Sequence, residues 1–345
     1  MRRRVYIANT GGTIGMQPDP DRGYMPAPGH LADLMDRMPE LGNPDMPAYT
    51  LHEYDPLLDS ANMSPADWLR IANDIVAHYD DYDGFVVVHG TDSMAYTASA
   101  LSFFLGPGLA KPVIVTGSMI PLVETRSDAR ENLITAMMIA AEYPIPEVCL
   151  FFGSRLFRGS RAVKVHATGF NAFDSPNYPP LGTVGVRIRI HYDRVRGVPA
   201  DAAPPAAVPT PQPMPVVGAL RVFPGITAQL TRSVLATPLN ALVLEAYGMG
   251  NGPSRNEAFV EALAEAVARG VTIVDCTQCL RGTVDLSGYA TGADLARAGV
   301  LSGYDTTVEA ALAKLIFLYS QALPTDTIRE LMGVSLCGEV TPQAK

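Results

Sequence analysis

The stretch Thr10-Gly11-Gly12-Thr13-Ile14-Gly15 directly follows the apolar run Val5-Tyr6-Ile7-Ala8. The run predicts a short strand, and the glycines predict a tight turn at its carboxyl end. Ligands bind at this end of the strands in open α/β sheets. Glycines let backbone N–H groups come close to a ligand, and a threonine hydroxyl can act as a nucleophile. A glycine motif this short also fits a turn without any function, so the motif alone does not separate the two interpretations.

Strand and helix patterns alternate through the first part of the chain. The continuous run Phe85-Val86-Val87-Val88 is typical of a parallel strand that is buried on both faces. Further strands are predicted at residues 50–54, 112–116 and 148–152, and helices at 64–79, 93–105 and 127–141. This alternation predicts an α/β fold with a mostly parallel sheet that is flanked by helices.

The segment after the opening turn contains four prolines, at positions 18, 20, 26 and 28. Because proline breaks helices, residues 17–29 are predicted to form a loop, and this loop carries Tyr24. A dinucleotide-binding glycine motif must instead lead straight into a helix whose N-terminus holds the pyrophosphate. A Rossmann-type dehydrogenase is therefore disfavoured.

A proline-rich segment divides the chain. Residues 198–215 contain seven prolines among alanines, which is typical of an extended linker. Beyond it the pattern begins again, with strands at 216–223, 241–245 and 271–276, and helices at 227–235, 254–269, 306–321 and 325–332. A chain of 345 residues is long enough for two domains. We therefore predict a larger N-terminal α/β domain (1–197) that carries the threonines, a linker (198–215) and a smaller C-terminal α/β domain (216–345).

The composition argues against several kinds of partner. A net charge of −9 disfavours nucleic acid and anionic membrane surfaces. Arg2, Arg3 and Arg4 are followed by an apolar run of only four residues, which is too short for a signal peptide. No stretch approaches the length of a transmembrane helix. We expect a soluble, cytoplasmic protein without a membrane partner.

A second threonine, in the pair Thr91-Asp92, follows the strand at 85–88 as Thr13 follows the first strand. In a parallel sheet both turns lie along the same edge. A threonine hydroxyl needs a base, such as a lysine that burial keeps neutral. Among only four lysines, Lys164 is the one that lies in loop-rich sequence. These residues are consistent with a Thr–Asp–Lys relay, and a solvated basic loop around Lys164 is the alternative.

Other catalytic and metal-binding patterns are missing. The chain has no G-x-x-x-x-G-K-[ST] phosphate loop and no G-x-S-x-G nucleophile turn. Its six histidines lack the spacing of metal ligands, so no metal site is predicted. Cys276 and Cys279 form a C-x-x-C pair, but neither a helix start after the first cysteine nor a second pair supports a redox or zinc role. We expect reduced, structural thiols.

The two threonine motifs together resemble the asparaginase/glutaminase family, the bacterial threonine amidohydrolases. Residues 10–15 are similar to the first family signature. His89-Gly90-Thr91-Asp92-Ser93-Met94 is similar to the second, with Ser93 where threonine is commoner. The resemblance covers nearly the whole chain and continues at 96–101, 116–118, 126–128, 289–292 and 305–310. The missing signal peptide makes the chain similar to the cytoplasmic, type I branch.

The resemblance implies hydrolysis of L-asparagine to L-aspartate and ammonia without a cofactor. A weaker glutaminase activity is left open, because it depends on the volume of the substrate pocket. It implies that Thr13 is the nucleophile and forms an acyl-enzyme, and that Tyr24 lies on a flexible loop that closes over the site and hydrogen-bonds Thr13. Thr91, Asp92 and Lys164 match the second catalytic triad. The group that activates Thr13 is left open. Family members form dimers that often pair into tetramers, so a homodimer or homotetramer is implied.

The substrate contacts follow from the same comparison and from the charges of the substrate. The resemblance implies that Asp59 and Ser60 bind the α-groups of asparagine and that Asp92 holds its amino group. A zwitterion needs a carboxylate for its ammonium and donors for its carboxylate, which these residue types provide. The backbone N–H groups of Gly12-Thr13 and Gly90-Thr91 are candidates for stabilising the oxyanion at the amide carbon.

Two alternatives share the scaffold. The amidase subunit of an archaeal-type tRNA amidotransferase carries both threonine signatures, but it has an extra N-terminal domain, for which a signature beginning at Thr10 leaves no room. A non-catalytic asparagine-binding protein is the other alternative. The presence of all five catalytic-type residues argues against it: Thr13, Tyr24, Thr91, Asp92 and Lys164.

Overall fold

The computed structural model describes residues 2–21, 23–236 and 238–342, and the chain divides into two compact units, 1–208 and 209–345. The division falls inside the predicted linker, and residues 198–215 form neither helix nor strand. Residue 1 and residues 343–345, the outer ends of the two predicted domains, lie outside the described residues. The domain limits at 197 and 216 stay predictions.

An eight-stranded sheet forms the centre of the first unit, in the order β12-β11-β8-β7-β6-β5-β1-β4. Five strands are parallel: β1 (Arg4–Gly11), β4 (Ala48–Leu58), β5 (Gly84–Val88), β6 (Val113–Thr116) and β7 (Val148–Phe152). Three shorter strands extend the sheet in antiparallel fashion: β8 (Arg155–Arg158), β11 (Gly182–Val184) and β12 (Ile188–Ile190). The predicted α/β fold with a mostly parallel sheet is confirmed, whereas the antiparallel extension was not predicted.

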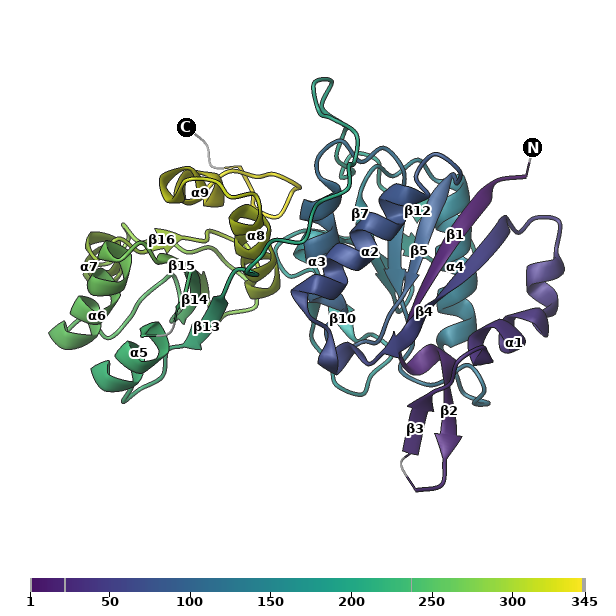
Figure 1. The fold of residues 1–345 in the computed structure, drawn as a ribbon, viewed down its shortest axis with the longest axis horizontal. Helices are drawn as coiled ribbons and strands as arrows, with labels where there is room; N and C mark the ends of the chain where they lie inside the picture. Colours follow the sequence, from purple (N-terminus) through teal and green to yellow (C-terminus); the bar gives the residue numbers. More distant parts are fainter. Residues whose placement is uncertain (1, 22, 237, 343–345) are drawn as a thin grey trace. The chain divides into compact units, whose positions relative to one another are not determined.

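Helices cover both faces of this sheet (Figure 1). α2 (Pro65–Ala77) and α3 (Met94–Leu105) lie on one side, and α4 (Ala129–Glu142) lies on the other. Alternate residues of β1 and β5, such as Ile7 and Val86, pack in the same buried cluster as the apolar residues of α4. The residues between them, such as Tyr6 and Phe85, are buried on the opposite face, where their rings contact each other. Burial on both faces is why these strands are continuous apolar runs in the sequence.

The segment predicted as a loop at 17–29 contains a small β-hairpin. β2 (Met16–Asp19) pairs with β3 (Gly23–Pro26), and Tyr24 lies opposite Pro18. The prolines exclude a helix, as expected, but a two-stranded ladder has unpaired edges that tolerate them. The short helix α1 (His30–Asp36) follows and was not predicted. Its N-cap is Gly29, which provides no side-chain cap and therefore no start signal in the sequence.

The second unit is built on a parallel four-stranded sheet, in the order β13-β14-β15-β16. Because the strands follow one another in chain order, right-handed crossovers place the three connecting helices on one face. Two further helices cover the other face. The strands are β13 (Val217–Arg221), β14 (Ala241–Ala246), β15 (Thr272–Thr277) and β16 (Leu301–Ser302). The helices are α5 (Ala228–Leu235), α6 (Glu257–Ala268), α7 (Ala290–Arg297), α8 (Val308–Ser320) and α9 (Thr325–Met332). α7 was not predicted, since Gly292 inside it weakens the helix signal.

A buried ion pair ties the end of this unit to α8. Lys314 Nζ lies 2.7 Å from Glu339 Oε1, and the two side chains are 1% and 0% exposed. Lys314 also donates to the Val334 carbonyl at 2.6 Å, and Glu339 accepts from the Cys337 N–H at 2.8 Å. A buried pair of this kind is stable only when both charges have such further hydrogen bonds.

His89 fixes the turn that follows β5. It is fully buried, with Nδ1 2.7 Å from the Gly90 carbonyl oxygen and Nε2 2.9 Å from Thr97 Oγ1. Since a carbonyl can only accept, Nδ1 donates and Nε2 accepts the Thr97 hydroxyl proton, which requires the neutral imidazole. Burial lowers the pKa of His89 to about 4. A neutral histidine therefore links this turn to α3.

We expect the free energy of unfolding to fall as the pH decreases from about 6.5 to about 4. In that range the unfolded chain binds a proton at His89 that the folded chain does not bind. The pKa change from 6.5 to about 4 corresponds to a loss of up to ~3 kcal/mol. In His89→Gln, whose amide can still donate to Gly90 and accept from Thr97, this part of the pH dependence should disappear. Urea unfolding of both proteins between pH 4 and 8 measures it, and parallel stability curves would contradict the assignment.

Candidate active site

Two glycine turns touch at the carboxyl edge of the first sheet. Gly12 has a φ of +93°, and a Cβ built on it would lie 2.4 Å from Gly90 N and 2.6 Å from Gly90 Cα. No side chain fits in that space, so only glycine allows the turn after β1 to pack on the turn after β5. The residues that follow the two glycines, Thr13 and Thr91, are thereby brought to neighbouring places along this edge.

The two threonines of the first signature have different surroundings. Thr10 is buried at the end of β1, and its hydroxyl donates to the Val88 carbonyl at 2.8 Å, so it fixes the turn. Thr13 begins a short 3₁₀ turn, η1 (Thr13–Gly15), and is half-buried. Within the described part of the chain, its hydroxyl has no hydrogen-bond partner. Thr13 therefore has the free hydroxyl of the pair.

The loop after β4 packs against the same turns. A Cβ on Gly90 would lie 2.3 Å from Ser60 Oγ, and the Ser93 hydroxyl donates to the Ser60 carbonyl at 2.6 Å. Asp59 caps the short turn η3 (Ser60–Asn62) by accepting from the Ala61 N–H at 3.0 Å. Ser60 is buried, whereas Asp59 is exposed. The two predicted substrate-binding residues therefore lie directly beside the second signature.

Lys164 joins the two polar residues of the second signature. Its Nζ lies 3.0 Å from Thr91 Oγ1 and 2.8 Å from Asp92 Oδ1. Thr91 is buried, the Lys164 side chain is 21% exposed and the Asp92 side chain is 67% exposed. The three side chains therefore extend from the buried interior to the solvent. The Asp92 carboxylate lies at the solvent end, where a cationic group can reach it. The three residues that the sequence placed in one relay are in contact.

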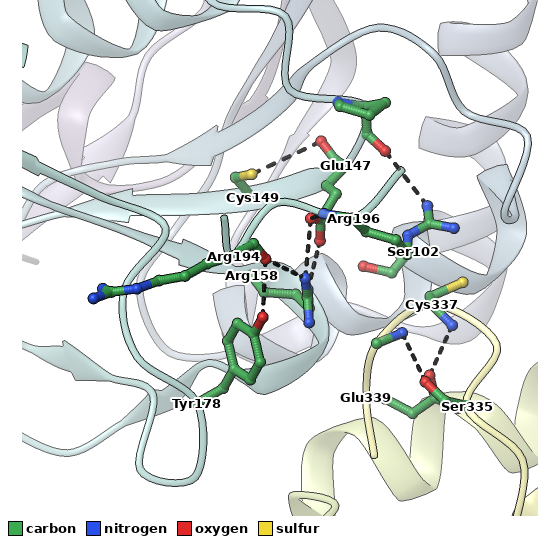
Figure 2. Close-up of polar contacts among 12 residues, drawn as sticks. Ser102, Glu147, Cys149, Arg158, Tyr178, Arg194, Arg196, Ser335, Cys337 and Glu339 are labelled. Carbon is green, nitrogen blue, oxygen red and sulfur yellow. Dashed lines mark hydrogen bonds and ion pairs between the residues drawn. The ribbon is translucent and has the colours of Figure 1, made fainter. Parts of the chain in front are cut away.

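A buried ion pair anchors the segment that delivers Lys164. Arg158 donates to both carboxylate oxygens of Glu147 and, at 2.9 Å, to the Arg194 carbonyl, which also accepts from the Tyr178 hydroxyl (Figure 2). The next turn, η4 (Gly159–Arg161), packs on α3, where a Cβ on Gly159 would lie 2.9 Å from the Ala98 carbonyl oxygen. Lys164 follows in the two-residue strand β9 (Val163–Lys164).

The basic stretch around Lys164 is therefore not a solvated loop. Arg158 and Arg161 are 6% and 1% exposed. The charge of Arg158 is compensated by Glu147, and that of Arg155 by Asp174, whose Oδ1 lies 3.0 Å away. The alternative interpretation of this stretch is wrong because its arginines are buried or paired. The acidic partners lie outside the stretch, so the stretch alone does not show the pairing.

Tyr24 lies on the hairpin strand β3 and is 46% exposed. Its hydroxyl donates to Glu124 Oε1 at 2.9 Å, and in this structure its contact is with Glu124 rather than with Thr13. Sequence reasoning missed Glu124, which belongs to the loop after β6. The only available signal was its position after a third parallel strand, on the same edge as Thr13 and Thr91.

The described residues offer no metal centre and no membrane span. Among them, no group of three or more His, Cys, Asp or Glu side chains could hold a metal ion. Within the same residues, no helix has the length and hydropathy needed to cross a membrane. None of the four cysteines forms a disulfide, and among them Cys279 alone is exposed. The side chains that Lys164 joins at the site, those of Thr91 and Asp92, contribute a hydroxyl and a carboxylate group.

Comparison with known proteins covers both units. The family model "Asparaginase, N-terminal" matches residues 4–196, and the model "Glutaminase/Asparaginase C-terminal domain" matches residues 216–332. The chain is 53% identical over 344 residues to L-asparaginase 1 of Escherichia coli K12, and the match covers 99% of each protein. It is 32% identical to a subunit of the glutamyl-tRNA(Gln) amidotransferase of Methanobrevibacter smithii, with 98% of this chain but 77% of that protein covered.

A solved structure has the same fold over the full length. The crystal structure of L-asparaginase I from Vibrio cholerae matches with a TM-score of 0.89 and 49% identity, and the match covers 99% of this chain and 100% of that one. The expected resemblance is therefore confirmed, and the chain belongs to the asparaginase family.

Proposed function

We propose that this chain is an L-asparaginase, which hydrolyses L-asparagine to L-aspartate and ammonia. The observation that carries the proposal is the contact of Lys164 with both Thr91 and Asp92, beside the glycine contact that brings the Thr13 turn to the same edge. The relatives named L-asparaginase 1 and L-asparaginase I, at 53% and 49% identity over nearly the full length, support the same substrate.

In this proposal Thr13 is the nucleophile. Its Oγ attacks the side-chain amide carbon of asparagine, the carbon–nitrogen bond breaks, and ammonia leaves with the proton that the hydroxyl gives up. An aspartyl ester of Thr13 remains. Water then hydrolyses the ester, which releases L-aspartate and restores the hydroxyl. The free Thr13 hydroxyl, next to the turn of Gly90 and Thr91, supports this role.

The charges around the site suit a small zwitterion. Asp92 presents an exposed carboxylate to the substrate ammonium, and the turn of Asp59 and Ser60 offers hydroxyl and backbone donors to the carboxylate. Backbone N–H groups of Gly12 and Gly90 lie in the two contacting turns, where they can stabilise an oxyanion. A weaker glutaminase activity remains part of the proposal, since glutamine carries the same groups on a side chain one methylene longer.

An amidotransferase subunit is the second candidate function. The observation that points to it is the 32% identity to the amidotransferase relative. This identity is lower than the 53% identity to L-asparaginase 1, so asparaginase remains the first candidate. An amidase that supplies ammonia to a tRNA-bound substrate does not need rapid turnover of free asparagine. A non-catalytic asparagine-binding protein would have no turnover at all. Release of ammonia from free asparagine therefore separates the candidates.

A homodimer or homotetramer and a reducing compartment also belong to the proposal. Apolar side chains stand exposed on the loops after three successive strands of the second unit: Phe223 (45%), Met249 (40%) and Leu280 (61%). Several large apolar side chains on one sheet edge favour a protein partner, and a second copy of the chain is the one proposed. Four cysteines without a disulfide are consistent with the cytoplasm.

The purified protein should release ammonia from free L-asparagine without added tRNA, nucleotide or metal. Ammonia assays across asparagine and glutamine concentrations measure it, and we expect asparagine to be the better substrate. The same assay after treatment with a chelator is the control. Turnover that requires tRNA, or that a chelator abolishes, contradicts the proposal.

Thr13→Ala should lower kcat by about 10⁴-fold or more, because it removes the atom that forms the ester. Thr13→Ser keeps a hydroxyl and should retain part of the rate. Thermal unfolding of both variants checks that the fold is intact. Turnover like that of the parent protein in Thr13→Ala moves the nucleophile to Thr91.

Lys164→Met should lower kcat by about 10²- to 10⁴-fold, the range of a positioned acid–base group, while weak asparagine binding persists. Lys111→Met is the matched control, since Lys111 donates to the Tyr82 carbonyl at 2.8 Å, at the opposite end of the strands. Steady-state kinetics and calorimetric binding separate the two effects. Normal rates in Lys164→Met would mean that Lys164 contributes a charge to the structure and no catalytic function.

A further inference from the structure

The hairpin β2–β3 contacts the rest of the first unit through a side chain far away in the sequence. Tyr24 on β3 donates its phenolic proton to Glu124 Oε1 at 2.9 Å. The two residues belong to different loops on the same edge of the sheet, one after β1 and the other after β6. This contact places the Glu124 carboxylate next to the hydroxyl of Tyr24, the only tyrosine in the sequence of the hairpin.

The loop that carries Glu124 is held by hydrogen bonds at both ends. Asp128 accepts from the backbone N–H groups of Met119 and Ile120, each at 3.0 Å. The Ser127 hydroxyl donates to the Ile120 carbonyl at 2.9 Å. Leu122 N–H donates to the carbonyl of Ile14 at 3.1 Å, inside the turn that begins with Thr13. The loop is therefore fixed to the turn that carries the proposed nucleophile, and Glu124 is two residues beyond that contact.

The hairpin is held far less firmly. In the part of the chain that the structure describes, its two strands pair with each other and with no other strand, and Tyr24 is 46% exposed. Within the described residues, the recorded partner of the Tyr24 hydroxyl is Glu124. The hydrogen bond to this carboxylate raises the pKa of the Tyr24 phenol, so the phenol stays protonated. A phenol that donates a hydrogen bond to one group still has oxygen lone pairs that can accept a hydrogen bond from another group.

We propose that Glu124 is a positioning residue that acts through Tyr24. By accepting a hydrogen bond from the Tyr24 hydroxyl, its carboxylate turns the lone pairs of the phenolic oxygen toward the Thr13 hydroxyl when the hairpin covers the site. The chain Thr13–Tyr24–Glu124 then polarises the Thr13 hydroxyl in one direction. This inference rests on the proposed function, in which Thr13 is the nucleophile and Tyr24 its hydrogen-bond partner.

A positioning role and a merely structural role of the Tyr24–Glu124 contact predict different effects when Glu124 is replaced. The hydrogen bond joins an exposed tyrosine to a half-buried glutamate, and such a bond near the surface contributes little to folding stability. Loss of Glu124 should therefore leave thermal unfolding nearly unchanged. A positioning role predicts that the loss falls on kcat, because the oriented hydroxyl matters in the step that forms the ester.

Glu124→Ala should lower kcat by about tenfold with little change in KM, the range expected for one hydrogen bond to a charged group. Glu124→Gln keeps an acceptor oxygen without the charge and should lose less. Glu131→Ala removes an exposed carboxylate from the first turn of α4 and is the matched control, with kcat unchanged. Equal rates for the parent protein and Glu124→Ala overturn the inference.

A double-mutant cycle tests whether Glu124 acts through Tyr24. Tyr24→Phe should lower kcat by at least as much as Glu124→Ala. In the Tyr24→Phe protein, the further change Glu124→Ala should have no effect. If it lowers kcat by the same factor in both proteins, Glu124 acts by another route and the inference is wrong.

Titration of Tyr24 keeps the inference separate from the proposed activity. In protein labelled with ¹³C at tyrosine Cζ, the Tyr24 signal is the one that disappears in Tyr24→Phe. Its titration midpoint should fall in Glu124→Ala and stay in place in Glu131→Ala. A midpoint that does not move overturns the contact itself. If Tyr24→Phe and Thr13→Ala leave the rate unchanged while the midpoint moves, the proposed function has failed rather than the contact.

Discussion

The contact between Gly12 and Gly90 is the constraint on which the rest of the site depends. A Cβ on Gly12 would lie 2.4 Å from Gly90 N, and one on Gly90 would lie 2.3 Å from Ser60 Oγ. Three loops from three neighbouring strands are therefore nested without room for a methyl group. Catalysis needs reacting groups held to within a fraction of an ångström. Here direct contact between backbone segments provides that precision, because backbone atoms have no alternative side-chain rotamers.

Much of the fold was predictable because parallel strands leave a clear pattern. Strands buried on both faces are continuous apolar runs, and their carboxyl ends share one edge, so Thr13 and Thr91 could be placed together. The antiparallel strands β8, β11 and β12 span only three or four residues, which is too short for a period to be recognised. Glu124 escaped notice because a single carboxylate in a loop carries no periodicity and no spacing.

Charge patterns were the least reliable part of the sequence reasoning. The stretch from Arg155 to Lys164 has four basic residues, which is typical of a solvated surface. Its partners, Glu147 and Asp174, lie outside the stretch on either side, so the sequence does not show that the charges are neutralised. Once paired, the arginines become rigid supports. Lys164, at the end of the stretch, is the basic residue that contacts Thr91 and Asp92.

The surroundings of the two threonines favour a division of roles between them. The Thr91 oxygen accepts a hydrogen bond from the Lys164 ammonium, which withdraws electron density and makes that oxygen a poorer nucleophile. The Thr13 oxygen has no such donor within the described residues, and it lies at the base of the hairpin that carries Tyr24. Two identical side chains on one sheet edge thus acquire different reactivity from their neighbours. This difference supports the proposal that Thr13 attacks the substrate, while Thr91 and Lys164 hold and move protons.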